Sequence, residues 1–142
     1  MNKSVLVAFA AVVALSGCDS LLPPPDQPAH PSRIGRFIGL VSRCGCSDIS
    51  KTRMAAEWPK VVQGRYTPEQ IQQMRGYVNA ALDENFDNQI EICAEACSQK
   101  CMVESVAQPL EGRSTGVAAC PITERDLHLT FGRFQSDTPA SR

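Results

Sequence analysis

The stretch Cys93-Ala-Glu-Ala-Cys97-Ser-Gln-Lys-Cys101 carries three cysteines, each four residues after the previous one. In an α-helix this spacing places them one above another on one face, with neighbouring Cβ atoms about 5–6 Å apart. A disulfide requires a Cβ–Cβ distance of roughly 3.8 Å. We therefore expect each of these cysteines to pair with a cysteine elsewhere in the chain, so that the helix is stapled to other segments.

Three further cysteines can supply the partners: Cys44, Cys46 and Cys120. The α-carbons of residues 44 and 46 are roughly 5.5–7 Å apart. This separation matches the rise of about 6 Å between neighbouring cysteines on the helix. We expect this pair to bond to Cys93 and Cys97, in an order that the spacing leaves open. Cys101 is then expected to pair with Cys120, nineteen residues later.

The same cysteines allow two other interpretations. A ladder of thiols is typical of a Cu(I) site, and three methionines supply further soft ligands (Met54, Met74 and Met102). The Cys-x-x-x-Cys ladder resembles those of copper-storing four-helix bundles, although only one helix carries it here. Thiol–disulfide exchange usually needs a Cys-x-x-Cys at a helix start, whereas Cys44-Gly-Cys46 follows a helix. A copper-binding or thiol-handling envelope protein is thus the alternative function.

The two histidines, His30 and His128, lack the spacing of a zinc site and are expected at the surface. No haem-attachment motif, Gly-x-Ser-x-Gly or phosphate-binding glycine loop occurs in the sequence. We therefore expect no cofactor, no metal and no catalytic residues, and a protein that is not an enzyme.

The remaining cysteine, Cys18, follows a different kind of segment. Lys3 precedes an unbroken apolar run from Val5 to Leu15, which has the length of a secretory signal and is too short to span a membrane. The next residues, Leu15-Ser16-Gly17-Cys18, resemble the lipobox of bacterial lipoproteins. The resemblance implies that residues 1–17 are a signal peptide and that Cys18 is acylated with fatty acids such as palmitate.

The residues after Cys18 indicate how a folded domain would be held. In bacterial lipoproteins, an Asp at the position of Asp19 tends to retain the protein at the inner membrane, so this location is favoured over the outer membrane. Residues 18–31 contain five prolines, which favour a stiff, extended chain. We expect a tether that holds a periplasm-facing domain away from the lipid surface, in the bacterial cell envelope.

Charge excludes one class of partner. The whole chain has a net charge of −1, and the 125 residues that would follow cleavage carry 13 basic and 15 acidic residues. This composition gives nucleic-acid binding no electrostatic support. Residues 33–65 are mainly basic and residues 69–111 mainly acidic, so the two segments are expected to attract each other if they pack together, unless both are ordinary solvated helix faces.

Helical periodicity predicts the elements of a domain over residues 32–110. A first helix is expected from an N-cap at Ser32 to Cys44, ended by Gly45. A second is expected from a cap at Ser47 or Asp48 through Glu57, before Pro59. Gly64 marks a turn.

Thr67-Pro-Glu-Gln70 is a capping box and predicts a helix start. From there an apolar stripe runs through nine positions: Ile71, Met74, Val78, Leu82, Phe86, Ile90, Cys93, Cys97 and Cys101. We expect a break near residues 83–88 and an end at Pro109.

Beyond it, residues 111–142 are expected to form an irregular arm and a disordered tail. Alternating Leu127, Leu129 and Phe131 favour a short strand there. The predicted fold is mainly α, a small disulfide-stapled helical bundle with an irregular C-terminal arm.

Trp58, beside Pro59, Val61 and Val62, is the one large apolar cluster outside the helical stripes, and Tyr66 lies close by. Core packing is one interpretation. The other is a docking surface for a second envelope protein, since Trp and Tyr are favoured at interfaces. Together these features favour a lipid-anchored accessory or structural subunit of an envelope protein complex.

Overall fold

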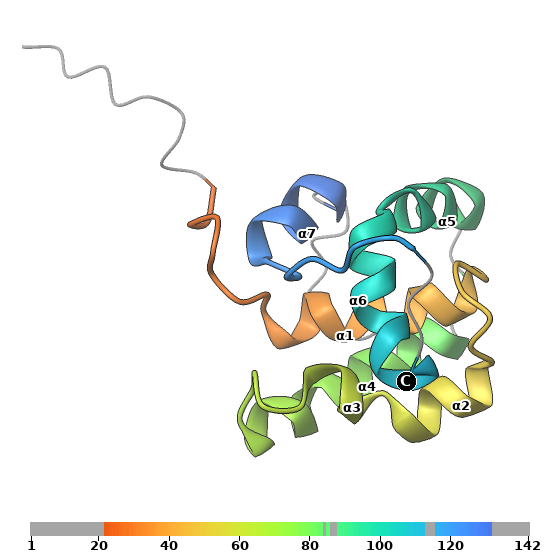
Figure 1. Cartoon of the computed structure of the whole chain (residues 1–142), viewed down its shortest axis with the longest axis horizontal. Helices are drawn as coiled ribbons and strands as arrows, with labels where there is room; N and C mark the ends of the chain where they lie inside the picture. Colours follow the sequence, from red (N-terminus) through yellow and green to blue (C-terminus); the bar gives the residue numbers. More distant parts are fainter. Residues whose placement is uncertain (1–21, 84, 86–87, 113–115, 132–142) are drawn as a thin grey trace, which may run out of the picture.

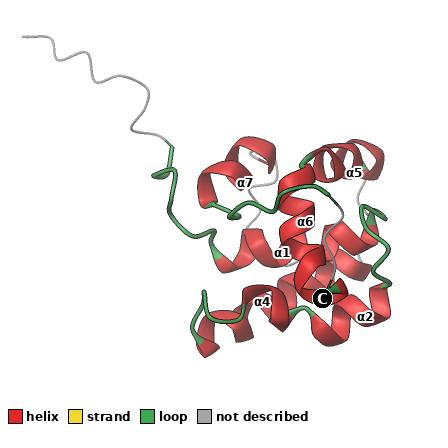
Figure 2. Ribbon diagram, in the orientation of Figure 1, coloured by secondary structure: helices red, strands yellow, loops and turns green. Residues whose placement is uncertain are grey.

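The chain forms a bundle of helices joined by loops (Figures 1 and 2). A computed structural model describes residues 22–83, 85, 88–112 and 116–131. These residues form seven helices: α1 (Pro31–Arg43), α2 (Lys51–Glu57), α3 (Pro59–Val62), α4 (Pro68–Asp83), α5 (Gln89–Ser98), α6 (Lys100–Glu111) and α7 (Glu124–Phe131). No strand occurs in these residues. The mainly α, disulfide-stapled architecture is therefore confirmed.

The contact between α1 and α4 is the most extensive in the bundle. Two glycines of α1 allow the helices to approach closely. A Cβ atom at Gly39 would lie 2.5 Å from the Cβ of Ala81 and 2.7 Å from the carbonyl oxygen of Val78. A Cβ at Gly35 would lie 3.0 Å from the carbonyl oxygen of Met74. Glycine has no side chain to prevent this approach, and large apolar residues of both helices are fully buried beside it.

Local capping explains where several helices begin. The capping box of α4 is confirmed, because Thr67 N–H donates to Gln70 Oε1 at 2.9 Å and Gln70 N–H donates to Thr67 Oγ1 at 3.3 Å. The expected cap of α2 at residue 47 or 48 is wrong. Ser50 occupies that position, since its hydroxyl accepts the N–H of Arg53 at 3.2 Å. Gly64 has the positive φ of 81° that its turn requires.

The long apolar stripe is interrupted twice. The break expected near residues 83–88 is confirmed, because α4 ends at Asp83 and α5 begins at Gln89. A second break at Gln99, with φ −81° and ψ 66°, separates α5 from α6 and was not predicted. The predicted apolar face is wrong in α5, because Ile90 is 87% exposed, whereas Ile92 and Ala96 are buried. The first break therefore changes which face of the next helix meets the core.

Two predictions for the C-terminal part are wrong. Pro109 does not end α6, because it lies in the last turn, and the helix ends at Gly112, which has a φ of 64°. The expected strand at residues 127–131 is helix α7. Its start is fixed by Thr123, whose hydroxyl accepts the N–H of Asp126 at 3.1 Å. Leu127 is consequently buried and Leu129 exposed, as residues on two sides of a helix are.

The folded domain begins earlier than its expected start at residue 32. Ala29 is 1% exposed and Pro31 is the first residue of α1. Pro28 forms an isolated antiparallel β-bridge with Thr123, so the N-terminal segment lies beside the start of α7 (Figure 1). Residues 28–31, the last part of the expected tether, therefore belong to the folded domain. The predicted tail from residue 135 lies outside the described residues.

None of the described helices combines the length and the apolar character needed to cross a membrane.

Candidate functional site

Two disulfides join α5 to the end of α1. Cys44 pairs with Cys93 and Cys46 with Cys97, with Cα–Cα distances of 5.1 and 5.0 Å. This is the pairing that the matched spacing predicted, now with the order determined. Only Ile92 and Ala96 of α5 are buried, so these two covalent links are a large part of what holds the helix in place.

Gly45 directs the two neighbouring cysteines to different turns of α5. Its φ of 66° ends α1, and its N–H donates to the carbonyl of Ser42 at 3.1 Å. The N–H of Cys46 donates to the carbonyl of Val41 at 3.0 Å. These two bonds form a Schellman motif, the usual glycine-terminated helix end. The predicted role of Gly45 at the end of the first helix is confirmed.

The third disulfide joins Cys101 of α6 to Cys120, with a Cα–Cα distance of 5.2 Å. Because of the break at Gln99, Cys93 and Cys97 lie in α5 whereas Cys101 lies in α6. The expectation that all three cysteines lie on one continuous helix is therefore wrong. Ser105 supports the bridge, since its hydroxyl accepts the N–H of Cys120 at 2.9 Å and lies against the carbonyl oxygens of both cysteines. Cys120 and the chain next to it are thereby held against α6.

All six cysteines of the folded domain are therefore oxidised in this structure. A Cu(I) site needs thiolates, and a disulfide sulfur has no thiolate to give. Among the described residues, no three His, Cys, Asp or Glu side chains are grouped so that they could hold a metal ion.

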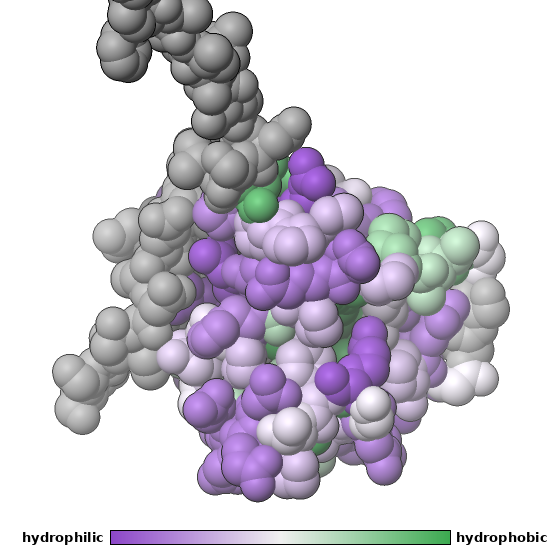
Figure 3. Space-filling model, turned by 90° about the vertical axis from the view of Figure 1, so that its left-hand side faces the viewer, coloured by the Kyte–Doolittle hydropathy of each residue, from purple (hydrophilic) through white to green (hydrophobic). Residues whose placement is uncertain are grey.

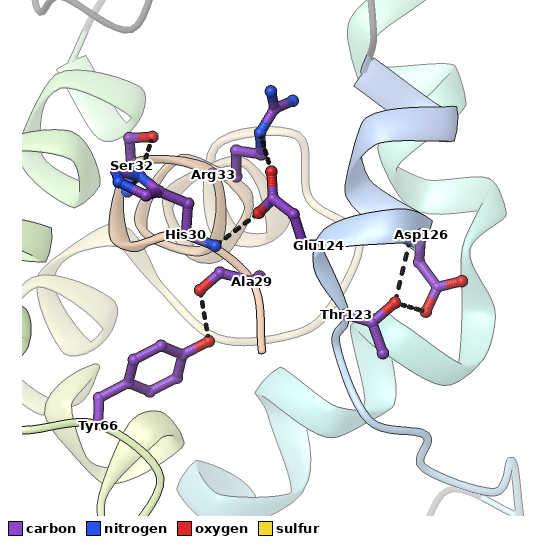
Figure 4. A network of polar contacts seen from close by, with 8 residues as sticks. All are labelled: Ala29, His30, Ser32, Arg33, Tyr66, Thr123, Glu124 and Asp126. Carbon is purple, nitrogen blue, oxygen red and sulfur yellow. Dashed lines mark hydrogen bonds and ion pairs between the residues drawn. The ribbon is translucent and has the colours of Figure 1, made fainter. Parts of the chain in front are cut away.

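A second cluster of interactions surrounds Glu124, where the N-terminal segment meets α7 (Figure 4). We call it the junction: residues 27–33, Tyr66 and residues 123–126. The carboxylate of Glu124 is 2.5 Å from Arg33 Nε and accepts the backbone N–H of His30 at 2.6 Å. The N–H of Glu124 donates to the carbonyl of Gln27 at 3.0 Å. Glu124 is 8% exposed, so it is a buried charge with a paired partner.

The start of α1 also lies in the junction. The predicted N-cap at Ser32 is wrong: His30 is the cap, and its Nδ1 accepts the N–H of Ser32 at 3.3 Å. Ser32 Oγ is 2.8 Å from the same nitrogen. This Ser–His contact resembles part of a hydrolytic triad, but Glu124 binds the backbone of His30 and not its ring. Ser32 is also 3% exposed, so the pair serves as a helix cap.

The two candidate docking residues lie in different environments. Trp58 is fully buried in the core, which contradicts its interpretation as a docking surface and agrees with core packing. Tyr66 is half-buried, and its hydroxyl donates to the carbonyl of Ala29 at 2.8 Å. Burial raises the pKa of Tyr66, and the charge of Glu124 raises it further, while Arg65 opposes both. Tyr66 is therefore part of the junction.

Two arginines of the basic segment satisfy the ends of helices from the acidic segment. Arg43 donates from Nη1 to the carbonyl of Leu82 at 3.0 Å and from Nη2 to Asn85 Oδ1 at 2.9 Å. Arg53 Nη2 donates to the carbonyl of Leu110. A positive charge near the C-terminal end of a helix is stabilising. The basic segment thus contacts the acidic one through backbone carbonyl groups at the ends of α4 and α6.

A cavity of about 260 Å³ lies between residues 45–48 and α6. Its charged lining residues are Asp48, Lys100, Glu104 and Glu111. No histidine lines it, and the one cysteine in its wall, Cys46, is in a disulfide. The one hydroxyl in the lining, that of Ser47, accepts the backbone N–H of Ile49 at 3.5 Å. The face of the molecule seen in Figure 3 is largely hydrophilic, with only small hydrophobic areas.

Sequence reasoning missed the junction, because Glu124 was not singled out and His30 was expected only as a surface residue, which it is. One signal was present: Thr123-x-x-Asp126 has the spacing of a helix-capping pattern. Cys18, the predicted lipidation site, lies outside the described residues.

Comparison with known proteins finds no matching family model, no matching curated protein and no matching solved structure.

Proposed function

We propose that this chain is a lipid-anchored, disulfide-stabilised accessory or structural subunit of a bacterial envelope complex, facing the periplasm and not acting as an enzyme. The single observation that carries the proposal is the continuity between a lipobox-like Cys18 and a folded domain whose N-terminal segment is held at the junction. Disulfides persist in oxidising compartments such as the periplasm, which supports this location.

The junction determines how far the domain can lie from an anchor at Cys18. Because residues 27–31 belong to the folded domain, only nine residue steps separate Cys18 from Gln27. At about 3.3–3.6 Å for each residue, the domain can lie at most roughly 30 Å away. A small domain held this close to the lipid surface can reach only partners that lie near the membrane themselves.

Labelling with radioactive palmitate in the bacterial host tests the anchor. Cys18→Ser should abolish incorporation and leave an uncleaved precursor or a protein released from the membrane. Ser20→Ala, two residues away, is the matched control and should keep the label. Label that survives in Cys18→Ser would exclude lipidation at this residue.

Crosslinking in whole cells followed by purification in mild detergent tests the role as a subunit. We expect defined crosslinks to another envelope protein that are lost when Cys18→Ser releases the domain from the membrane. If the purified protein instead catalysed a reaction, it would be an enzyme. If it contained one or more copper ions for each chain, it would be a copper-binding envelope protein.

A further inference from the structure

We propose that maturation of this protein requires a thiol–disulfide isomerase, a partner that presents a reactive thiol and rearranges wrongly paired cysteines. The inference rests on the connectivity of the three disulfides and is independent of the lipid anchor. In chain order, the bonds Cys44–Cys93 and Cys46–Cys97 cross each other. Neither bond joins cysteines that are adjacent in the sequence.

Oxidation of the unfolded chain favours other pairs. The native bonds close loops of 49 and 51 residues, whereas Cys93 and Cys97 are four residues apart and Cys44 and Cys46 are two apart. For a flexible chain, closure becomes less probable as the 3/2 power of loop length. This favours a Cys93–Cys97 bond, whose loop is four residues long, over Cys44–Cys93, whose loop is 49 residues long. Early oxidation should therefore produce the local, non-native pair.

The local pair is incompatible with the folded protein. In α5 the Cβ atoms of residues 93 and 97 would be about 5–6 Å apart, beyond the reach of an unstrained disulfide. A chain oxidised in this way cannot complete α5 or bury Ile92 and Ala96. The wrong bond must be broken before this part of the domain can form.

Loop length also fails to distinguish the native bonds from the exchanged pair, Cys44–Cys97 with Cys46–Cys93. The exchanged loops would contain 53 and 47 residues, close to the native 49 and 51. In the structure, Cys97 Sγ lies 3.9 Å from the carbonyl oxygen of Cys44, so the cysteines of the two bridges are close together. The correct order is selected only by the Schellman motif at Gly45 and by α5 itself. Reversible exchange is therefore needed until both have formed.

Three exchange steps convert the local pairs into the native ones. A thiolate of the partner attacks Cys97 Sγ, forms a mixed disulfide and releases Cys93 as a thiolate. Cys93 attacks Cys44 Sγ, forming the first native bond and releasing Cys46.

Cys46 then attacks the mixed disulfide at Cys97, which forms the second native bond and frees the partner's thiolate. Each step breaks one S–S bond and forms one, so no net oxidant or reductant is consumed. None of the six cysteines is fully buried in the folded protein.

Oxidative refolding of the full chain in detergent tests the proposal. The reduced, denatured protein is oxidised in a buffer without any small-molecule thiol, either alone or with a catalytic amount of protein disulfide isomerase that carries a reduced Cys-x-x-Cys. The bonds are then mapped by mass spectrometry. We expect mainly local bonds without the isomerase and at least about tenfold faster appearance of Cys44–Cys93 and Cys46–Cys97 with it. Native bonds that form equally fast in both samples would overturn the proposal.

Two double variants test whether the local cysteine pairs are the reason that the isomerase is needed. Cys46→Ala with Cys97→Ala removes the two shortest local pairs and leaves Cys93–Cys101, eight residues apart, as the shortest competing loop, so its Cys44–Cys93 bond should depend on the isomerase much less than in the wild type. Cys101→Ala with Cys120→Ala is the matched control, because it also removes one native bond but keeps both of these local pairs. It should remain dependent on the isomerase. If the isomerase accelerated the formation of Cys44–Cys93 equally in the two double variants, the local pairs would not be the reason for the requirement. The experiment maps disulfide bonds, so neither variant has to be fully stable.

Discussion

Glu124 is the residue on which the junction depends. Glu124→Ala would leave the N–H of His30 and the guanidinium of Arg33 without their shared acceptor. Both donors are only partly buried, so we expect the free energy of unfolding to fall by about 1 kcal/mol, the low end of the cost of an unsatisfied donor. Urea denaturation followed by the fluorescence of Trp58, the only tryptophan, measures it.

Asp83→Ala is the matched control for this change, because Asp83 is an exposed carboxylate at the end of α4. Its effect should stay within about 0.5 kcal/mol. If both variants were equally stable, the contacts of Glu124 would contribute nothing measurable.

Tyr66 gives the junction a dependence on pH. Its pKa is raised above the ordinary value of 10.0, first by burial and then by Glu124, so folding favours the neutral phenol. The stabilisation is therefore complete below pH 10 and is lost as the pH rises through the folded-state pKa. Tyr66→Phe also removes the hydrogen bond to Ala29, which contributes about 0.5–1.5 kcal/mol.

Denaturation curves recorded between pH 7 and 11 test this expectation. Wild type should be more stable than Tyr66→Phe at neutral pH, and the difference should shrink or reverse above pH 10. A difference that stays constant across the whole range would show that ionisation of Tyr66 is not coupled to folding.

Among the elements, the contact of α1 with α4 is the most sensitive to a small change. Gly39→Ala would place a Cβ 2.5 Å from that of Ala81, so the helices must separate. Overpacking of this kind costs about 1–3 kcal/mol. Gly76→Ala on α4 is the control, because nothing lies within 4 Å of its Cβ. It should stabilise the protein by up to about 1 kcal/mol, since alanine favours helix. Thermal melts of the two variants should therefore shift in opposite directions, and a shift in the same direction would contradict the close approach.

The elements that the sequence predicted correctly are those with a local signal. The capping box at Thr67, the glycine at position 45 and the cluster of capping residues after Asp83 each act within one turn of chain. The disulfide pairing was also predictable, because it depends on spacings of two and four residues in the sequence.

The elements that were missed have more than one cause: the start of α1 depends on a distant contact, the break at Gln99 has no breaker residue, and the local signal at α7 was outweighed by the alternation of apolar residues. His30, and not Ser32, caps α1 in a segment that Glu124 holds from 94 residues away. The break at Gln99 coincides with no glycine or proline. Alternation at residues 127–131 indicated a strand, although Thr123 starts a helix there. The junction could not be predicted, since nothing in either segment alone indicates that they meet.

At the scale of the whole molecule, the disulfides are expected to supply much of the stability. Each typically contributes about 2–4 kcal/mol, whereas a domain of this size is stable by only about 5–15 kcal/mol. The chain with all three bonds reduced and alkylated should therefore lose its cooperative thermal transition, as followed by circular dichroism. Protein treated with the alkylating agent alone should keep it. A cooperative melt in the reduced sample would show that the helical core is sufficient.

The junction also has a mechanical consequence. A force applied through the N-terminal segment reaches the contacts of residues 27–30 with Glu124 and Tyr66 before it reaches α1. Through Glu124 the load passes along a few residues to Cys120, whose covalent bond to Cys101 carries it into α6. Single-molecule pulling from residue 22 should release this segment first and leave the rest folded. The protein would then behave as a load-limiting attachment, in which the non-covalent contacts of residues 27–30 yield before α1 is loaded.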